Sequence, residues 1–131
     1  MDPFVVLIID DDHSLLAALE LVIGRIGGVR VIAVDNGDSA VRAAAEHRPR
    51  LILADVELGD LDGYAVCRLI RAEAADPEAQ IWFITGEPSR ADPRQAGQVA
   101  AQGFLMKPFG AAEVRKLVRG AMAAAAGPAP V

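Results

Sequence analysis

Five short apolar runs, rich in β-branched residues, alternate along the chain with stretches whose apolar residues recur at helical spacing. Continuous apolar runs of this length are typical of strands buried on both faces, and strands that alternate with helices join into parallel sheets through right-handed crossovers. The pattern therefore predicts an α/β fold, a three-layer doubly wound sheet of five parallel strands. The predicted strands are residues 4–9, 29–34, 51–54, 81–84 and 104–106.

The intervening segments are predicted helices. Gly27-Gly28 should stop the first helix, because glycine readily adopts the conformations that end helices. Asp38 or Ser39 should cap the second, since their side chains can accept a hydrogen bond from a free backbone N–H group. The predicted helices are residues 14–26, 38–47, 64–73, 93–101 and 111–125.

The segment from residue 87 to residue 102 has the weakest pattern. Pro88, Pro93 and Gly97 interrupt it, and Val99 is its only large apolar residue. Proline removes a backbone donor and short helices are marginal by themselves, so we expect a short, weakly held helix here.

The composition limits the size and surroundings of the protein. A chain of 131 residues with 53% hydrophobic residues can bury one core, so we expect one domain over residues 1–126 and a frayed tail over 127–131. The single cysteine, Cys67, cannot form an internal disulfide and fits a cytoplasmic protein. No run approaches the ~18–20 apolar residues of a membrane span. The Gly-Pro-Ala-Pro ending leaves open that the chain is a piece of a larger regulator.

The charge argues against nucleic acid as a direct ligand. The formal net charge is −5 and the sequence pI is about 4.9. An acidic domain has no general attraction for phosphate backbones, and the Lys and Arg residues are scattered, so we expect no direct nucleic-acid binding.

Four of the five predicted strands end in residues suited to phosphoryl chemistry, namely Asp10-Asp11, Asp55, Thr85 and Lys107. Ligands of doubly wound sheets bind beyond the carboxyl ends of the strands, so we expect these side chains to meet there. Clustered carboxylates need a cation, and their oxygens suit Mg²⁺. A hydroxyl and a lysine suit phosphate oxygens, and an aspartate can be the nucleophile that becomes an aspartyl phosphate.

The sequence resembles the response-regulator receiver domains from Val5 to about Val118. The carriers are the segments LIIDDD, LILADVELGDLDG, FITG and GFLMKPF, in this order and spacing. The resemblance implies a flavodoxin-like fold that acts as a phosphoryl acceptor and assists its own phosphorylation and dephosphorylation, rather than an enzyme. The donor it implies is a histidine kinase or a histidine phosphotransfer protein.

The resemblance also implies roles for individual residues. Asp55 matches the phosphorylated aspartate, and Asp10 and Asp11 match the acidic pair that organises Mg²⁺ or Mn²⁺, with Asp11 as the direct ligand of the two. Glu57 matches the position whose backbone carbonyl completes the metal shell. Thr85 and Lys107 match the phosphate contacts.

Further positions concern signalling. Thr85 and Phe104 match the switch pair of the family, and the Lys107–Pro108 peptide bond matches one that is cis. The output is then a downstream protein target or a homodimer, through the face of the fourth helix, fifth strand and last helix. Two residues depart from the family pattern: Gly59 replaces a usual proline, and Glu57 is acidic where a neutral residue is common.

Two other functions compete with this interpretation. A phosphatase of the haloacid dehalogenase type would use the Asp10-Asp11-Asp12 segment as its nucleophile motif, but it needs an acidic pair after the lysine, where only Glu113 follows. A pseudo-receiver would keep the fold without phosphorylation, although every matching catalytic position is present here.

The remaining polar and aromatic residues near these motifs have structural interpretations. Asp12 should cap the first helix, and Asp62-Gly63 should form a turn. Cys67 should lie in or near the core. We expect packing roles for the aromatic residues and solvent exposure for the histidines, namely Tyr64, Trp82, His13 and His47.

Overall fold

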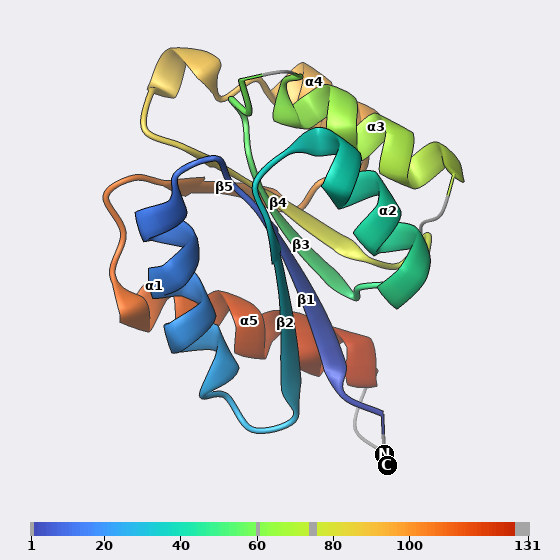
Figure 1. The fold of residues 1–131 in the computed structure, drawn as a ribbon, viewed down its shortest axis with the longest axis vertical. Helices are drawn as coiled ribbons and strands as arrows, with labels where there is room; N and C mark the ends of the chain where they lie inside the picture. Colours follow the sequence, from blue (N-terminus) through green and yellow to red (C-terminus); the bar gives the residue numbers. More distant parts are fainter. Residues whose placement is uncertain (1, 60, 74–75, 128–131) are drawn as a thin grey trace.

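Five parallel strands form one sheet in the order β2-β1-β3-β4-β5 in the computed structural model, which describes residues 2–59, 61–73 and 76–127. This confirms the predicted doubly wound α/β fold (Figure 1). The strands are β1 Phe4–Ile9, β2 Val29–Val34, β3 Leu51–Asp55, β4 Gln80–Thr85 and β5 Gly103–Met106. The helices are α1 His13–Gly24, α2 Gly37–His47, α3 Gly63–Glu73, the 3₁₀ turn η1 Pro88–Arg90, α4 Pro93–Gln98 and α5 Ala111–Ala126.

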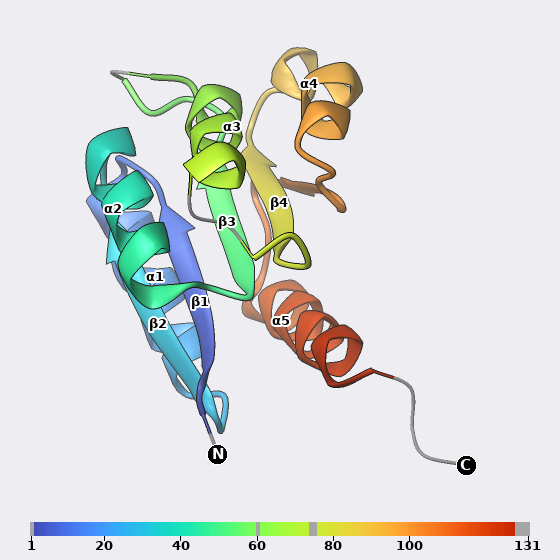
Figure 2. The same ribbon diagram turned by 90° about the vertical axis from the view of Figure 1, so that its right-hand side faces the viewer.

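Helices cover both faces of the sheet, which explains why the strands are apolar along their whole length. Helices α1 and α5 pack on one face, and α2, α3 and α4 pack on the other (Figures 1 and 2). Successive residues of a strand point to opposite faces, so Leu7 and Ile9 face α2 and α3 whereas Val6 and Ile8 face α1 and α5. Each face therefore has its own apolar core.

Three predicted helix ends were wrong, in α2, α1 and α4, and α4 ends at Gln98 instead of near Ala101. Helix α2 begins at Gly37, and its N-cap is Asn36, whose side chain accepts a hydrogen bond from the Ser39 N–H group at 2.8 Å. Asp38 and Ser39 thus lie inside the first turn, because the cap residue lies two positions before Asp38 and has an extended backbone. Helix α1 ends at Gly24, since the Ile26 N–H group already bonds three residues back, to Ile23, instead of continuing the helical ladder.

The segment between β4 and β5 is short and irregular, as expected. Helix α4 has six residues and follows the turn η1. Side chains of α3 hold its backbone: the Tyr64 hydroxyl donates to the Arg90 carbonyl at 2.6 Å and accepts from the Asp92 N–H group at 2.9 Å. The Arg71 guanidinium donates to the Val99 carbonyl at 2.9 Å. Polar bonds from one neighbouring helix therefore replace much of the apolar anchoring that the sequence lacks.

Both aromatic residues pack, and both also form hydrogen bonds: the Trp82 indole Nε1 donates to Gln80 Oε1 at 3.2 Å. Tyr64 is buried and its ring centroid lies 4.6 Å from that of Phe83. Burial raises the pKa of its hydroxyl, which keeps the group protonated as a donor. Trp82 is half-buried and lies over Gly103 of β5, where an added Cβ atom would approach the indole to 2.8 Å. Glycine at position 103 thus makes room for the only tryptophan of the sequence.

The smaller expectations had mixed outcomes. Cys67 is buried, and burial raises the pKa of its thiol to about 12, which confirms a core position. His13 is exposed and forms a 2.8 Å contact with Asp35, whereas the side chain of His47 is only 22% exposed, so its expected exposure was wrong. Residues 128–131 of the predicted tail lie outside the described residues. Within the described ranges, no helix is long and apolar enough to cross a membrane.

Candidate functional site

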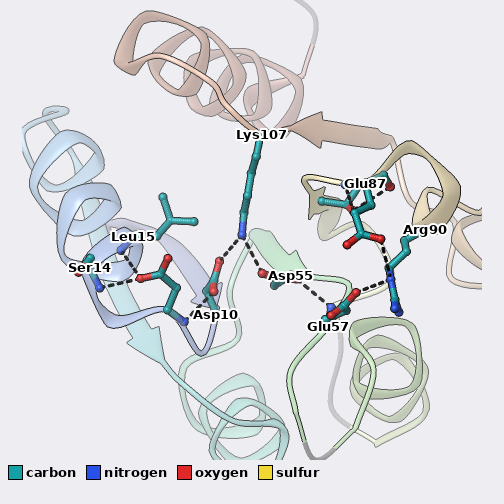
Figure 3. Close-up of polar contacts among 10 residues, drawn as sticks. Asp10, Ser14, Leu15, Asp55, Glu57, Glu87, Arg90 and Lys107 are labelled. Atoms are coloured by element: carbon teal, nitrogen blue, oxygen red, sulfur yellow. Dashed lines mark hydrogen bonds and ion pairs between the residues drawn. The ribbon is translucent and has the colours of Figure 1, made fainter.

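The ends of four strands bring the predicted side chains to one edge of the sheet. In the parallel register Ile9 pairs with Ala54, so the residues that follow β1 lie level with Asp55 at the end of β3. Carboxylate oxygens of Asp10, Asp11 and Asp55 lie within 4.8 Å of one another. Figure 3 shows Lys107, which directly follows the carboxyl end of β5, reaching Asp10 and Asp55.

Lys107 is the cation of this cluster. Its Nζ atom donates to Asp55 Oδ2 at 3.0 Å and lies 3.6 Å from Asp10 Oδ2. Burial lowers the pKa of the Lys107 ammonium, but the hydrogen bond to Asp55 and the charges of Asp10 and Asp55 outweigh burial, so the pKa is raised. Lys107 therefore stays charged at neutral pH. The Lys107–Pro108 peptide bond is cis.

Asp10 is fully buried and incompletely bonded. Its Oδ1 atom accepts a hydrogen bond from the Asp12 N–H group at 2.9 Å. Its Oδ2 atom has no hydrogen-bond partner within the described part of the chain. Burial, together with the charge of Asp55, raises the pKa of the Asp10 carboxyl to about 6, although the Asp12 N–H group and Lys107 oppose the shift.

This arrangement fits a divalent cation. A buried carboxylate oxygen that lacks a partner is costly unless a positive charge or a donor reaches it. Asp11 is exposed at the same edge, so the cluster is open to solvent on one side. Carboxylate oxygens with room for water match the preference of Mg²⁺. Asp10, Asp11 and Asp55 are the residues that would hold it.

Asp55 lies in an open cavity of about 330 Å³ at the sheet edge. Its Oδ1 atom accepts a hydrogen bond from the Glu57 N–H group at 2.8 Å, while Oδ2 bonds to Lys107. Thr85 is buried beside it, and its hydroxyl donates to the Glu87 carbonyl at 3.2 Å. The lining residues are Asp11, Asp55, Glu57, Gly59, Thr85, Gly86, Glu87 and Lys107.

Two glycines shape the loop after Asp55. Gly59 has φ +79°, a conformation closed to proline, so the departure from the family pattern matches a different loop backbone. At Gly63 an added Cβ atom would lie 2.0 Å from the Asp55 carbonyl oxygen, so only glycine lets the loop return against the strand. Asp62 accepts from the Ala65 N–H group at 2.7 Å, and α3 begins at Gly63, so the pair has a structural role but starts a helix instead of forming the predicted turn.

Phe104, the predicted switch aromatic, is half-buried on β5. It pairs in register with Phe83, and the two ring centroids are 6.1 Å apart. The Phe83 ring in turn packs on Tyr64. An aromatic row thus runs from β5 to the start of α3.

Sequence reasoning missed one charged residue at this site. Arg90 forms ion pairs with Glu57 and Glu87, two residues that line the cavity. Its spacing of three residues from Glu87 is the only sequence signal, and it is a weak one.

Comparison with known proteins agrees with this geometry. The family model described as the response regulator receiver domain matches residues 6–119. The chain belongs to the response-regulator receiver domain family. It is therefore a receiver domain of the two-component signalling type.

Individual relatives of this receiver domain are longer than the chain. The transcriptional regulatory protein PrrA of Mycobacterium tuberculosis is 36% identical over 110 residues, which cover 83% of this chain and 46% of PrrA. The DNA-binding response regulator MtrA of Mycobacterium leprae is 33% identical over 114 residues, covering 87% of this chain and 49% of MtrA. The chain thus spans about half the length of the curated relatives that it matches.

Solved structures share the fold of this receiver domain. The chemotaxis response regulator CheY4 of Vibrio cholerae has a TM-score of 0.81 at 24% identity and covers 91% of this chain and 98% of its own. The response regulator domain of Thermotoga maritima CheB has a TM-score of 0.78 at 23% identity and covers 97% and 99%.

The carboxylate cluster predicts stabilisation of the receiver domain by Mg²⁺. Only the folded state assembles Asp10, Asp11 and Asp55, so a cation held there adds about 2.7 kcal/mol at a hundredfold excess over Kd. Thermal melts should show a higher midpoint with Mg²⁺ than with a chelator. Asp11→Ala should lose most of this shift, and the control Asp38→Ala, on the exposed start of α2, should keep it. An equal shift in Asp11→Ala would contradict the site.

The raised pKa of Asp10 predicts a pH-dependent effect of Asp10→Asn in metal-free protein. Because the folded-state pKa of about 6 exceeds the ordinary value of 3.8, ionisation of Asp10 disfavours the folded state. The cost is small at pH 4 and below, grows as the pH rises from the ordinary pKa toward the folded-state pKa, and is complete above about pH 7. Asp10→Asn should therefore stabilise the protein by about 1–2 kcal/mol at pH 7.5 and by little at pH 4. Denaturant melts in chelator at both pH values test this, and destabilisation at pH 7.5 would refute it.

Proposed function

We propose that this receiver domain accepts a phosphoryl group on Asp55 from a histidine kinase or a histidine phosphotransfer protein, with Mg²⁺ bound at Asp10, Asp11 and Asp55. The supporting observation is the surroundings of Asp55: its carboxylate bonds to Lys107, lies within 4.8 Å of two other carboxylates and opens into a cavity beside Thr85. A cytoplasmic location accords with such a donor.

The transfer needs one nucleophile and charge neutralisation. An Asp55 carboxylate oxygen forms the new P–O bond while the bond from phosphorus to the donor's leaving group breaks, and that group departs with the electron pair. Bound Mg²⁺ would supply positive charge to the phosphoryl oxygens. Lys107, now 3.0 Å from Asp55 Oδ2, can turn to a phosphoryl oxygen, and the Thr85 hydroxyl can exchange Glu87 for the same group. The backbone carbonyl of Glu57 is the proposed further metal ligand.

The competing phosphatase interpretation loses support from the contacts. Its nucleophile segment begins with Asp10, which is fully buried and bonded to the Asp12 N–H group. Asp12 itself accepts from the Ser14 and Leu15 N–H groups and caps α1. Glu113, the only acidic residue after the lysine, reaches back to the Gly110 N–H group at 3.5 Å at the start of α5.

The output of the domain is proposed to involve Thr85 and Phe104. Movement of Thr85 toward a phosphoryl group on Asp55 would withdraw its hydroxyl from the Glu87 backbone, which it now contacts through both donor and acceptor bonds. Phe104 is already half-buried against Phe83 and has no hydroxyl to desolvate, so its inward state has a low cost. The face of α4, β5 and α5 would then bind a downstream protein or a second copy.

The relatives suggest where such an output could lead. MtrA is named a DNA-binding response regulator, and this chain matches about half of it. For the 131 residues themselves, with a net charge of −5, we propose protein partners and no direct contact with nucleic acid.

Phosphorylation of Asp55 is the first test. Incubation with acetyl phosphate and Mg²⁺ should add one phosphoryl mass that hydroxylamine removes, because acyl phosphates are labile to that nucleophile. Mass spectrometry should show no adduct on Asp55→Asn and a full adduct on Asp38→Asn, which makes the same chemical change on the exposed start of α2. Equal labelling of Asp55→Asn would sink the assignment, and an unlabelled wild type would favour a pseudo-receiver.

The segment between Thr85 and Lys107 should respond most to activation. Helix α4 is short and held by a few polar bonds, so it should open at low free energy. Hydrogen exchange with and without beryllofluoride, a phosphoryl mimic, should therefore change most over residues 86–106. Changes confined to the neighbourhoods of Asp10 and Asp55 would show that the proposed switch is wrong.

A further inference from the structure

A second charged cluster lies at the rim of the phosphoacceptor cavity. Arg90 in η1 forms an ion pair with Glu57, and its Nε atom lies 3.3 Å from Glu87 Oε2. Glu57 follows β3, Glu87 follows β4, and both line the cavity. Figure 3 shows Arg90 beside both glutamates, on the side of Asp55 away from Asp10. One cation thus joins the two loops that border the cavity mouth.

Two hydrogen bonds fix the backbone of Arg90. Its carbonyl accepts the Tyr64 hydroxyl at 2.6 Å, and its N–H group donates to the Glu87 carbonyl at 2.9 Å. Tyr64 is 2% exposed, and its ring packs on Phe83 in the core. The backbone from which the half-exposed Arg90 side chain extends is therefore anchored to the core, and the guanidinium itself is held by the two glutamates.

Negatively charged side chains outnumber positively charged ones among the described residues that line the cavity. Its described lining contains four carboxylates and one ammonium: Asp11, Asp55, Glu57, Glu87 and Lys107. A phosphoryl donor is an anion, so the excess of carboxylates opposes its approach. The Lys107 ammonium already forms an ion pair with Asp55. Arg90 is positioned to offset the charge of the two rim glutamates.

We propose that Arg90 is a positioning residue that controls charge at the mouth of the cavity: it pairs with Glu57 and Glu87, favours the approach of an anionic phosphoryl donor to Asp55 and opposes cation binding. The inference rests on the phosphoacceptor function proposed above. Arg90 forms no bond to phosphorus and transfers no proton. Ion pairs at exposed positions contribute little to folding, so its loss changes the local field more than the stability.

The test compares Arg90→Gln with Arg94→Gln, an identical change at an exposed residue of α4 that does not line the cavity. With acetyl phosphate at an ionic strength of about 0.02 M, Arg90→Gln should phosphorylate about threefold more slowly than wild type. The difference should vanish at about 0.5 M, where the Debye length is about 4 Å. Arg90→Lys should recover most of the rate, and Arg94→Gln should differ from wild type by less than about 1.5-fold.

A calorimetric Mg²⁺ titration gives a second readout with the opposite sign. Loss of the cation should tighten Mg²⁺ binding by Arg90→Gln about threefold at low ionic strength, whereas a merely damaged site would bind Mg²⁺ more weakly. Slowing that persists at high salt, an equal effect in Arg94→Gln, or weaker Mg²⁺ binding by Arg90→Gln would each overturn the inference. If wild type takes no phosphoryl group, the proposed function fails, and the titration still decides whether Arg90 offsets the rim charge.

Discussion

Mutual repulsion among Asp10, Asp11 and Asp55 is the constraint on which the rest of the structure depends. The fold holds their oxygens within 4.8 Å and places one of the three carboxylates entirely out of contact with water. Lys107 offsets part of that charge. The free-energy cost of the remaining repulsion is offset by burial of apolar side chains in the two cores, which cover strands β1 and β3 on both faces. The sheet is thus a rigid support for an arrangement that no flexible segment could keep.

The region beyond β4 is held mainly by hydrogen bonds instead of by apolar burial. Its backbone is held by the Tyr64 hydroxyl and the Arg71 guanidinium, and few of its own side chains enter the core. Hydrogen bonds at such boundaries can be exchanged for water or for other partners at a modest net cost, unlike buried apolar contacts. A rigid carboxylate cluster and a loosely held segment therefore lie in one domain, and the Phe83 and Phe104 rings pack between β4 and β5.

The sequence was informative where local pattern and topology decide the structure. Apolar runs predicted the strands, and parallel topology then required Asp55, Thr85 and Lys107 to meet at one edge. The predicted N-cap of α2 was wrong because several neighbouring side chains can accept the same backbone N–H group. Asn36 is the N-cap, although Asp38 has a side chain that could serve equally. The contacts of Arg90 with Glu57 and of Tyr64 with Asp92 join residues far apart in the chain, so only the assembled fold reveals them.

The seating of Trp82 over Gly103 has a practical consequence. This indole is the only one in the sequence, it is half-buried, and it lies where β4 meets β5, one residue from Phe104 in the neighbouring strand. Its emission spectrum is sensitive to the polarity and ring contacts around it. The protein therefore carries an unlabelled optical probe on the strand pair that contains both Thr85 and Phe104.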